Sequence, residues 1–114
     1  MKLSAAIDEY WLDKKLDFSL NTIRNYGYVF RYLVEYLGDA EIELVTSNDI
    51  RRFLEHLRTS RKMSRRSVHD AYIPLSSLWT WSAKEYGIPH IIREKITEPD
   101  YTERKISPFI QEEI

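Results

Sequence analysis

The basic residues between Arg58 and Arg66 form the densest group of side chains that could bind a charged partner. Five cations and no acid fall within nine residues, namely Arg58, Arg61, Lys62, Arg65 and Arg66. Such a cluster attracts anions, including the phosphate backbone of a nucleic acid. The alternative is a solvated surface segment, which is what most charged runs are.

Arg65 and Arg66 stand where a helix should begin, because Ser64 is a favourable N-cap residue. Cations in a first helical turn oppose the macrodipole at a cost of about 0.3–1 kcal/mol each, so a fold selected only for stability would place acids there. A bound phosphate would meet free backbone amides, the positive end of the dipole and two guanidinium groups together. This pair favours an anion-binding site, whereas Arg58 and Arg61 are compatible with ordinary solvated charges.

A second polar group flanks Ile23 at the start of another predicted helix. It consists of Asn21, Thr22, Arg24 and Asn25. Side chains of these types bond phosphates and base edges. Taken alone, the group is also explained by helix capping and solvent exposure.

The remaining chemistry-bearing residues do not form a catalytic or metal-binding pattern. His56, His69 and His90 have no partner at metal-ligand spacing, and the chain has no cysteine. Adjacent acids such as Glu112 and Glu113 do not share one helical face. There is no glycine-rich phosphate loop and no Gly-x-Ser-x-Gly elbow. We therefore expect no active site, metal or cofactor in this chain.

Overall composition indicates one soluble domain, and the charge distribution explains how it could meet an anion. The chain has 114 residues, 43% of them hydrophobic, and a net charge of −1. Residues 51–66 hold seven Lys/Arg and one Glu, a local charge of +6, while residues 1–50 carry −4 and residues 67–114 carry −3. No apolar run is long enough for a membrane span, and no signal peptide is evident. We expect a cytoplasmic location.

Helical periodicity is strong in four places, and it predicts an all-α fold. The expected helices are Ser4–Leu16, Leu20–Leu37, Ser47–Arg58 and Ser64–Tyr86. Their predicted N-caps are Ser4, Ser19, Thr46 (in a capping box with Asp49) and Ser64, and Gly38 and Gly87 provide stops. Pro74 lies inside the fourth helix, where we expect a bend rather than a division.

Apolar side chains at three- and four-residue spacing define the expected core. The second helix contributes Ile23, Tyr26, Phe30, Leu33 and Leu37, and the third contributes Ile50, Phe53, Leu54 and Leu57. On the fourth helix the buried face comprises Val68, Ala71, Leu75, Leu78, Trp79 and Ser82. Trp79 is assigned to the core because it shares the face of Leu75 and Leu78, and Trp81 is left open between core packing and base stacking.

Periodicity fades after Pro89. Residues 93–105 are charged, contain Pro99 and predict an extended linker. Residues 106–114 predict the first turn of a further helix, with Pro108 at its start. The chain is therefore interpreted as the front part of a longer protein.

Four segments resemble, in order, the N-terminal core-binding domain of tyrosine recombinases and phage integrases. The first is Ser19-x-x-Thr22-Ile23-x-x-Tyr26-x-x-x-Phe30-x-x-Leu33, and the second is Leu44-Val45-Thr46-x-x-Asp49-Ile50-x-x-Phe53-Leu54. The third is Met63-Ser64-x-x-Ser67-Val68 followed by Leu75-x-x-Leu78-Trp79-x-Trp81-Ser82, and the fourth is Ile106-Ser107-Pro108-Phe109-x-x-Glu112-Glu113-Ile114. Pro74 and the acidic overall charge depart from the family pattern.

The resemblance implies a SAM-like bundle of four main helices that forms half of a clamp around duplex DNA, the catalytic domain forming the other half. In the family the second and fourth helices face the DNA. Carried onto this sequence, that selects Asn21, Thr22, Arg24, Asn25, Lys62, Ser64, Arg65, Arg66 and His69. The family's catalytic Arg, Lys, His and Tyr residues belong to the downstream domain, so His90-x-x-Arg93 is interpreted as a coincidental match to its His-x-x-Arg box.

The sequence thus predicts a DNA-binding core domain over residues 1–92, a linker over 93–105 and the start of a catalytic domain over 106–114. The chain itself is not expected to be an enzyme. Its expected partners are duplex DNA, the catalytic domain of the same chain and other recombinase protomers in a synaptic tetramer. Two alternatives remain, a helical protein-interaction module and a dimeric helix-turn-helix regulator.

Overall fold

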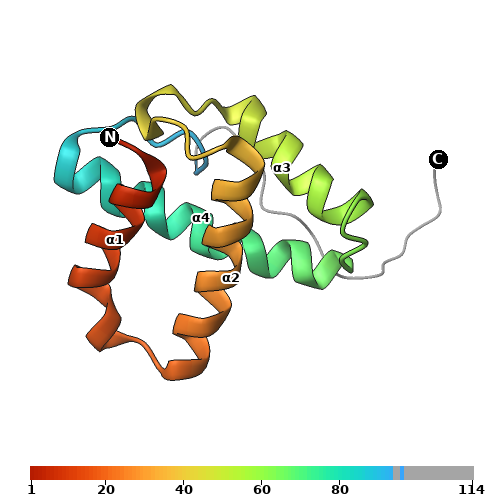
Figure 1. Ribbon diagram of the computed structural model, residues 1–114, viewed down its shortest axis with the longest axis horizontal. Coiled ribbons are helices and arrows are strands. Elements are labelled where there is room, and N and C mark those ends of the chain that lie inside the picture. Colours follow the sequence, from red (N-terminus) through yellow and green to blue (C-terminus); the bar gives the residue numbers. More distant parts are fainter. Residues whose placement is uncertain (94–95, 97–114) are drawn as a thin grey trace.

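The computed structural model describes residues 1–93 and residue 96. Six helical elements follow one another in this part of the chain: α1 (Leu3–Lys14), the 3-10 helix η1 (Lys15–Asp17), α2 (Leu20–Leu37), the 3-10 helix η2 (Ile42–Leu44), α3 (Ser47–Thr59) and α4 (Arg65–Tyr86). The predicted all-α bundle of four main helices is confirmed (Figure 1). The predicted linker, apart from Arg93 and Ile96, and the predicted start of a further domain lie outside the described residues.

Three of the four predicted N-caps are present. Ser19 and Ser64 each accept a hydrogen bond from the backbone amide three residues on, and Thr46 forms a complete capping box with Asp49. At the other ends of α2 and α4, Gly38 and Gly87 adopt the left-handed conformation that glycine tolerates best. Local capping chemistry therefore sets the limits of α2, α3 and α4.

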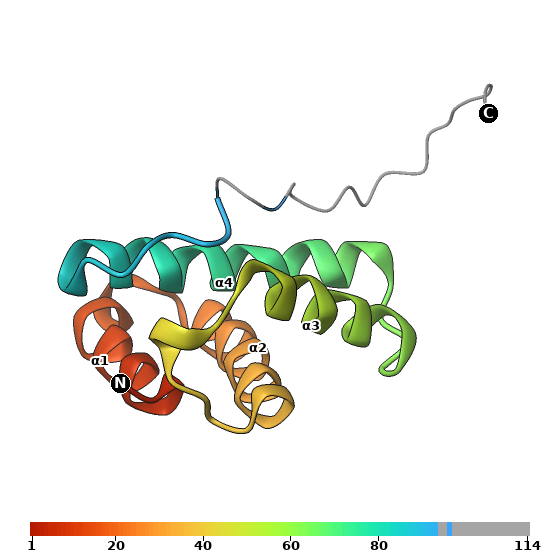
Figure 2. The ribbon, with the colours of Figure 1, turned by 90° about the horizontal axis from the view of Figure 1, so that it is seen from above.

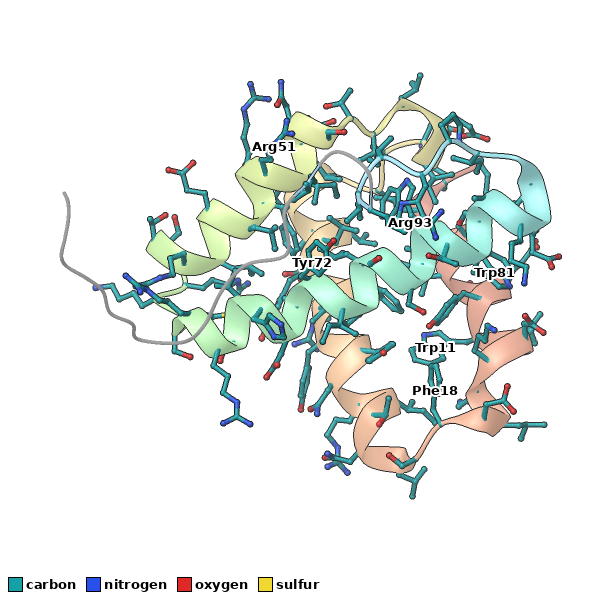
Figure 3. The ribbon with its side chains drawn as sticks, turned by 180° about the vertical axis from the view of Figure 1, so that it is seen from behind. Trp11, Phe18, Arg51, Tyr72, Trp81 and Arg93 are labelled. Carbon is teal, nitrogen blue, oxygen red and sulfur yellow. The ribbon has the colours of Figure 1, made fainter. Side chains whose placement is uncertain are left out.

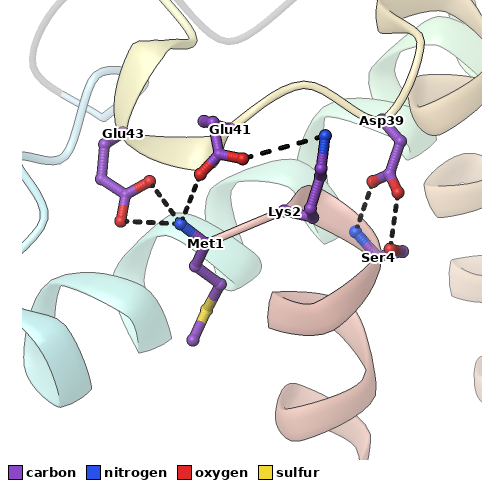
Figure 4. Close-up of polar contacts among 6 residues, drawn as sticks. All are labelled: Met1, Lys2, Ser4, Asp39, Glu41 and Glu43. Carbon is purple, nitrogen blue, oxygen red and sulfur yellow. Dashed lines mark hydrogen bonds and ion pairs between the residues drawn. The ribbon is translucent and has the colours of Figure 1, made fainter.

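The predicted cap at Ser4 is wrong. The N-cap residue of α1 is Lys2, which makes no side-chain cap, and Ser4 lies inside the helix. The Ser4 amide donates to Asp39 Oδ1 at 2.8 Å and its hydroxyl donates to Asp39 Oδ2 at 2.7 Å (Figure 4). These bonds hold the pKa of Asp39 below its ordinary value, and they link the start of α1 to the loop after α2.

The N-terminal ammonium group makes a second link to the same region. It donates to Glu41 Oε1 at 2.7 Å and to Glu43 Oε1 at 2.9 Å (Figure 4). These hydrogen bonds raise the pKa of the ammonium group and lower that of the Glu43 carboxyl. The first residues of the chain are thus held beside η2.

α4 continues through Pro74 as one helix, in agreement with the expectation of an undivided element (Figure 2). It lies along one side of α1, α2 and α3 and packs against all three. Its side chains Leu75, Leu78 and Trp79 are fully buried. α4 is therefore the element around which the bundle is built.

Trp81, which the sequence left undecided, is also buried. Its indole nitrogen donates to Asp13 Oδ2 at 3.0 Å, and its ring lies edge-on to Tyr10 with centroids 5.9 Å apart. Tyr10 in turn shares a 2.7 Å hydrogen bond with Ser77, and burial raises the pKa of its phenol. These contacts make Trp81 part of the α1–α4 core, so it is not a stacking platform on the surface.

The chain that follows Gly87 turns back along α4 (Figure 2). Ile88, Ile92 and Ile96 are buried, and the carbonyl of Ile91 accepts a 2.8 Å hydrogen bond from Ser47 at the start of α3. Further along, Ile96 accepts a 3.4 Å bond from the Tyr72 hydroxyl. This segment joins the start of α3 to the middle of α4. The four-residue spacing of its isoleucines is a signal that the sequence analysis missed.

Candidate nucleic-acid interface

The start of α2 presents three exposed polar side chains of the four predicted there. Asn21, Arg24 and Asn25 are exposed, whereas Thr22 is half-buried. The Thr22 amide donates to Ser19 Oγ at 3.1 Å, and its hydroxyl accepts from the same Ser19 hydroxyl at 3.0 Å. Thr22 therefore has a capping role in addition to any role in binding.

An aromatic cluster supports this end of α2. Figure 3 shows Trp11 and Phe18 close together at the turn between α1 and α2, and their ring centroids are 6.2 Å apart. Phe18 also contacts Tyr26 of α2, with centroids at 5.3 Å. These ring contacts thus hold in place the end of α2 on which the polar group lies.

The basic stretch separates into two kinds of cation. Arg58 donates to the backbone carbonyl of Met63 at 3.2 Å and so stabilises the connection between α3 and α4. Arg61 lies 4.0 Å above the ring centroid of Tyr32 and 3.6 Å from Glu35 Oε1, both on α2. The earlier interpretation of these two arginines as solvated charges is incomplete, because each makes a specific intramolecular contact.

The other cations lie within this connection or directly after it, and all are exposed: Lys62, Arg65 and Arg66. Lys62 adopts a positive φ of 57°, which turns the chain toward α4. Ser64 then caps α4 by accepting from the Ser67 amide at 3.1 Å, and the first turn of α4 contains no acid. Arg65 and Arg66 thus stand at a capped, positively polarised helix end, as predicted.

His69 is the most covered of the predicted residues on α4, with a side chain 16% exposed. Its Nδ1 lies 3.5 Å from Asp70 Oδ1. Only a small part of the imidazole can therefore reach a partner. The role of His69 in binding stays a prediction.

A groove of about 480 Å³ runs between α2 and the N-terminal half of α4. Its polar lining comprises Thr22 and Asn25 from α2 and Ser67 and Asp70 from α4, while its apolar and aromatic lining includes Tyr28, Val29, Tyr32, Met63, Ile73 and Pro74. The tertiary structure thus places Thr22 and Asn25 of the α2 group opposite Ser67 and Asp70 of α4 across one depression.

Ser67 and Asp70 were not selected from the sequence. They follow Ser64 at three-residue spacing, which places all three on one side of a helix. The three-residue spacing from Ser64 is the sequence signal that indicates both residues, although an acid is not a residue type expected at a surface for phosphates. The groove therefore adds one serine and one carboxylate to the candidate interface.

His90 has a local structural function. Its Nδ1 lies 3.3 Å and 3.1 Å from the donating amides of Ile92 and Arg93, and its Nε2 lies 2.9 Å from Thr80 Oγ1. These bonds hold the turn after α4, which gives His90-x-x-Arg93 a conformational explanation. Within residues 1–93 and 96, no three His, Asp or Glu side chains are grouped closely enough to hold a metal ion.

None of the helices in the described part of the chain combines the length and the apolar composition needed to cross a membrane.

Comparison with known proteins gives one family match. The model of the phage integrase N-terminal SAM-like domain matches residues 14–87. This range contains α2, α3 and α4, and hence both sides of the groove. Neither the curated proteins nor the solved structures gave a match.

Proposed function

Because the chain belongs to the family of phage integrase N-terminal SAM-like domains, we propose that it is the DNA-binding core domain of an integrase-type tyrosine recombinase. Its surface for duplex DNA consists of the start of α2 and the first turns of α4. The chain contributes binding and orientation, and strand cleavage belongs to the catalytic domain of the full-length protein. Other protomers in a synaptic tetramer are further expected partners.

The observation that carries this proposal is the start of α4. Arg65 and Arg66 are exposed on a first turn that has a serine cap and no acid. A phosphate there would gain from the helix dipole and from guanidinium hydrogen bonds. Asn25 lines the opposite side of the groove, and Asn21 and Arg24 are exposed at the same helix end. These three side chains would extend the contact to a neighbouring stretch of backbone.

Binding by this domain alone should be weak and strongly dependent on salt. If it contacts about four to six phosphates, log affinity should fall with log salt with a slope of roughly −4 to −5. We expect a Kd on the order of 10⁻⁵ M or weaker, in the range of non-specific binding. In the full-length protein the catalytic domain would close the clamp on the opposite face and raise the affinity.

The decisive experiment is a titration of duplex DNA with the wild type and an Arg65→Glu/Arg66→Glu variant over a series of salt concentrations. We expect the variant to lose at least tenfold in affinity at low salt and to show a shallower salt slope. The matched control is Arg51→Glu/Arg52→Glu, which makes the same charge change on exposed residues of α3. Equal losses for both pairs, or none for the first pair with helicity retained, would contradict the proposed surface.

A second candidate function, a protein-interaction module, is favoured by one observation. Leu12, Leu16 and Leu20 are 86%, 97% and 80% exposed around the turn between α1 and α2. Exposed apolar side chains of this kind mark protein contacts when they are grouped. A module that binds only proteins would show no salt-dependent affinity for duplex DNA, so the same titration separates the two functions. Sedimentation distinguishes a dimeric helix-turn-helix regulator, because the proposed domain should be monomeric.

A further inference from the structure

Asp70 is an acid in the middle of a surface proposed to bind a polyanion. It lines the groove together with Thr22, Asn25 and Ser67, and its side chain is 64% exposed. Among the described residues its ion-pair partner is His69, whose Nδ1 approaches Oδ1 at 3.5 Å. Most of the carboxylate therefore faces the groove and solvent.

A carboxylate in this place is unfavourable for phosphate binding. It repels the DNA backbone and offsets part of the attraction of the two arginines one turn earlier on α4. If the surface served only to bind backbone, a neutral residue would bind more tightly. The position of Asp70 is understandable if it meets a part of DNA that donates hydrogen bonds.

The major-groove edges of bases offer few such donors. The exocyclic amino groups of cytosine (N4) and adenine (N6) are the donors there, and the N7 and O6 atoms of guanine and the O4 atom of thymine are acceptors. An ionised carboxylate only accepts hydrogen bonds. It therefore suits the cytosine amino group, whereas adenine, with N7 adjacent to its amino group, suits an amide that both donates and accepts.

We propose that Asp70 reads sequence by accepting a hydrogen bond from the N4 amino group of a cytosine in the major groove, an inference that rests on the proposed function. Arg65, Arg66 and the α2 residues hold the backbone on either side, and α4 carries the exposed Asp70 carboxylate into the major groove, which is wide enough for a helix. Asp70 gives up non-specific affinity in return for discrimination at one base pair.

The test is a selection of bound sequences from a pool of duplexes with a randomised segment, carried out with the 114-residue chain at low salt. For the wild type we expect enrichment of cytosine at one position. Replacing that base pair in a selected duplex should weaken binding about fivefold to tenfold, the lower end of what one good base contact provides.

Two variants separate base reading from a charge effect. Asp70→Asn should shift the preference at that position from cytosine to adenine, and Asp70→Ala should abolish it. Both should bind unselected duplex more tightly than the wild type, because a negative charge is removed. Asp8→Asn makes the same change at an exposed position of α1 and should leave the base preference unchanged.

The outcomes distinguish this inference from the function on which it rests. If the wild type binds duplex DNA with the expected salt dependence but selects no sequence, or selects the same base as both Asp70 variants, the inference about Asp70 is overturned and the proposed function stands. If no duplex is bound in a salt-dependent manner, both fail.

Discussion

Arginines of this chain serve two purposes, and the difference lies in their immediate surroundings. Arg61 is held by the Tyr32 ring and by Glu35, so its charge is used to attach the α3–α4 connection to α2. Arg65, four residues later, is exposed and makes no hydrogen bond or ion pair with the described residues. A cation–π contact at an exposed site contributes about 0.5–1 kcal/mol, so Arg61 acts mainly within the fold.

Asp39 provides a prediction at the same scale. Its folded-state pKa is lowered by two hydrogen bonds from Ser4, so it stabilises the fold above its unfolded pKa, and this contribution is lost as the pH falls through the folded pKa. Asp39→Asn should therefore unfold at a lower denaturant concentration at neutral pH, and its difference from the wild type should shrink below about pH 4.

Asparagine is a suitable replacement because Asp39 has a φ of 54°, which asparagine also tolerates. The measurement is urea unfolding followed by circular dichroism across the acid range. An unchanged difference between the two proteins from neutral to strongly acid pH would show that the Ser4–Asp39 bonds do not stabilise the fold.

At the scale of the element, the helices are limited by caps and oriented by the residues between them. The capping box of α3 satisfies two backbone groups reciprocally, with Thr46 accepting from the Asp49 amide at 3.1 Å and Asp49 accepting from the Thr46 amide at 2.9 Å. Ser64 has the corresponding role in α4, where the first turn carries the proposed DNA contacts. A cap at this position thus supports both stability and the geometry of the proposed binding surface.

Thr46→Ala should lower the free energy of unfolding by about 1 kcal/mol, because the Asp49 amide loses its acceptor. DNA affinity should not change, since Thr46 lies on α3 and outside the groove. Thr59→Ala, an exposed threonine in the last turn of the same helix, is the control and should change stability by less than about 0.5 kcal/mol. Chemical denaturation of the three proteins measures the effect, and equal losses at both positions would rule out a specific contribution of the capping box.

At the scale of the whole molecule, the folded unit includes chain beyond the last α-helix. Ile88, Ile92 and Ile96 are buried against the bundle, and His90 fixes the turn that directs them there. The family match ends at residue 87, just before this segment. In a protein with a downstream domain, such a segment would set where the connection leaves the helical bundle.

Ile92→Ala should destabilise the protein by about 2–5 kcal/mol, because a fully buried side chain is truncated. The control, Leu16→Ala, removes the same kind of side chain from a position that is 97% exposed and should be nearly neutral. Thermal unfolding of the variants gives the comparison. A neutral effect of Ile92→Ala would mean that this segment does not belong to the cooperative unit.

The sequence alone determined the four main helices, their capping at Ser19, Thr46 and Ser64, and the buried faces of α3 and α4, because these depend on local chemistry and on helical periodicity. The mistaken cap at Ser4 has a tertiary cause, since its hydroxyl is satisfied by Asp39, 35 residues away. The burial of Trp81 likewise involves a partner distant in the sequence, because its indole nitrogen donates to Asp13 on α1.

For the candidate site, the dipole argument selected Arg65 and Arg66, and the family resemblance selected the polar start of α2; the role of both in binding stays a prediction. Only the tertiary structure showed that α2 and α4 form the two sides of one groove, that Arg61 is engaged with Tyr32 and Glu35, and that Asp70 lies among the candidate contacts. The physical reason is that residue type and spacing determine what a side chain can do and which helical face it occupies. The packing of one helix against another determines which charges remain available to a partner.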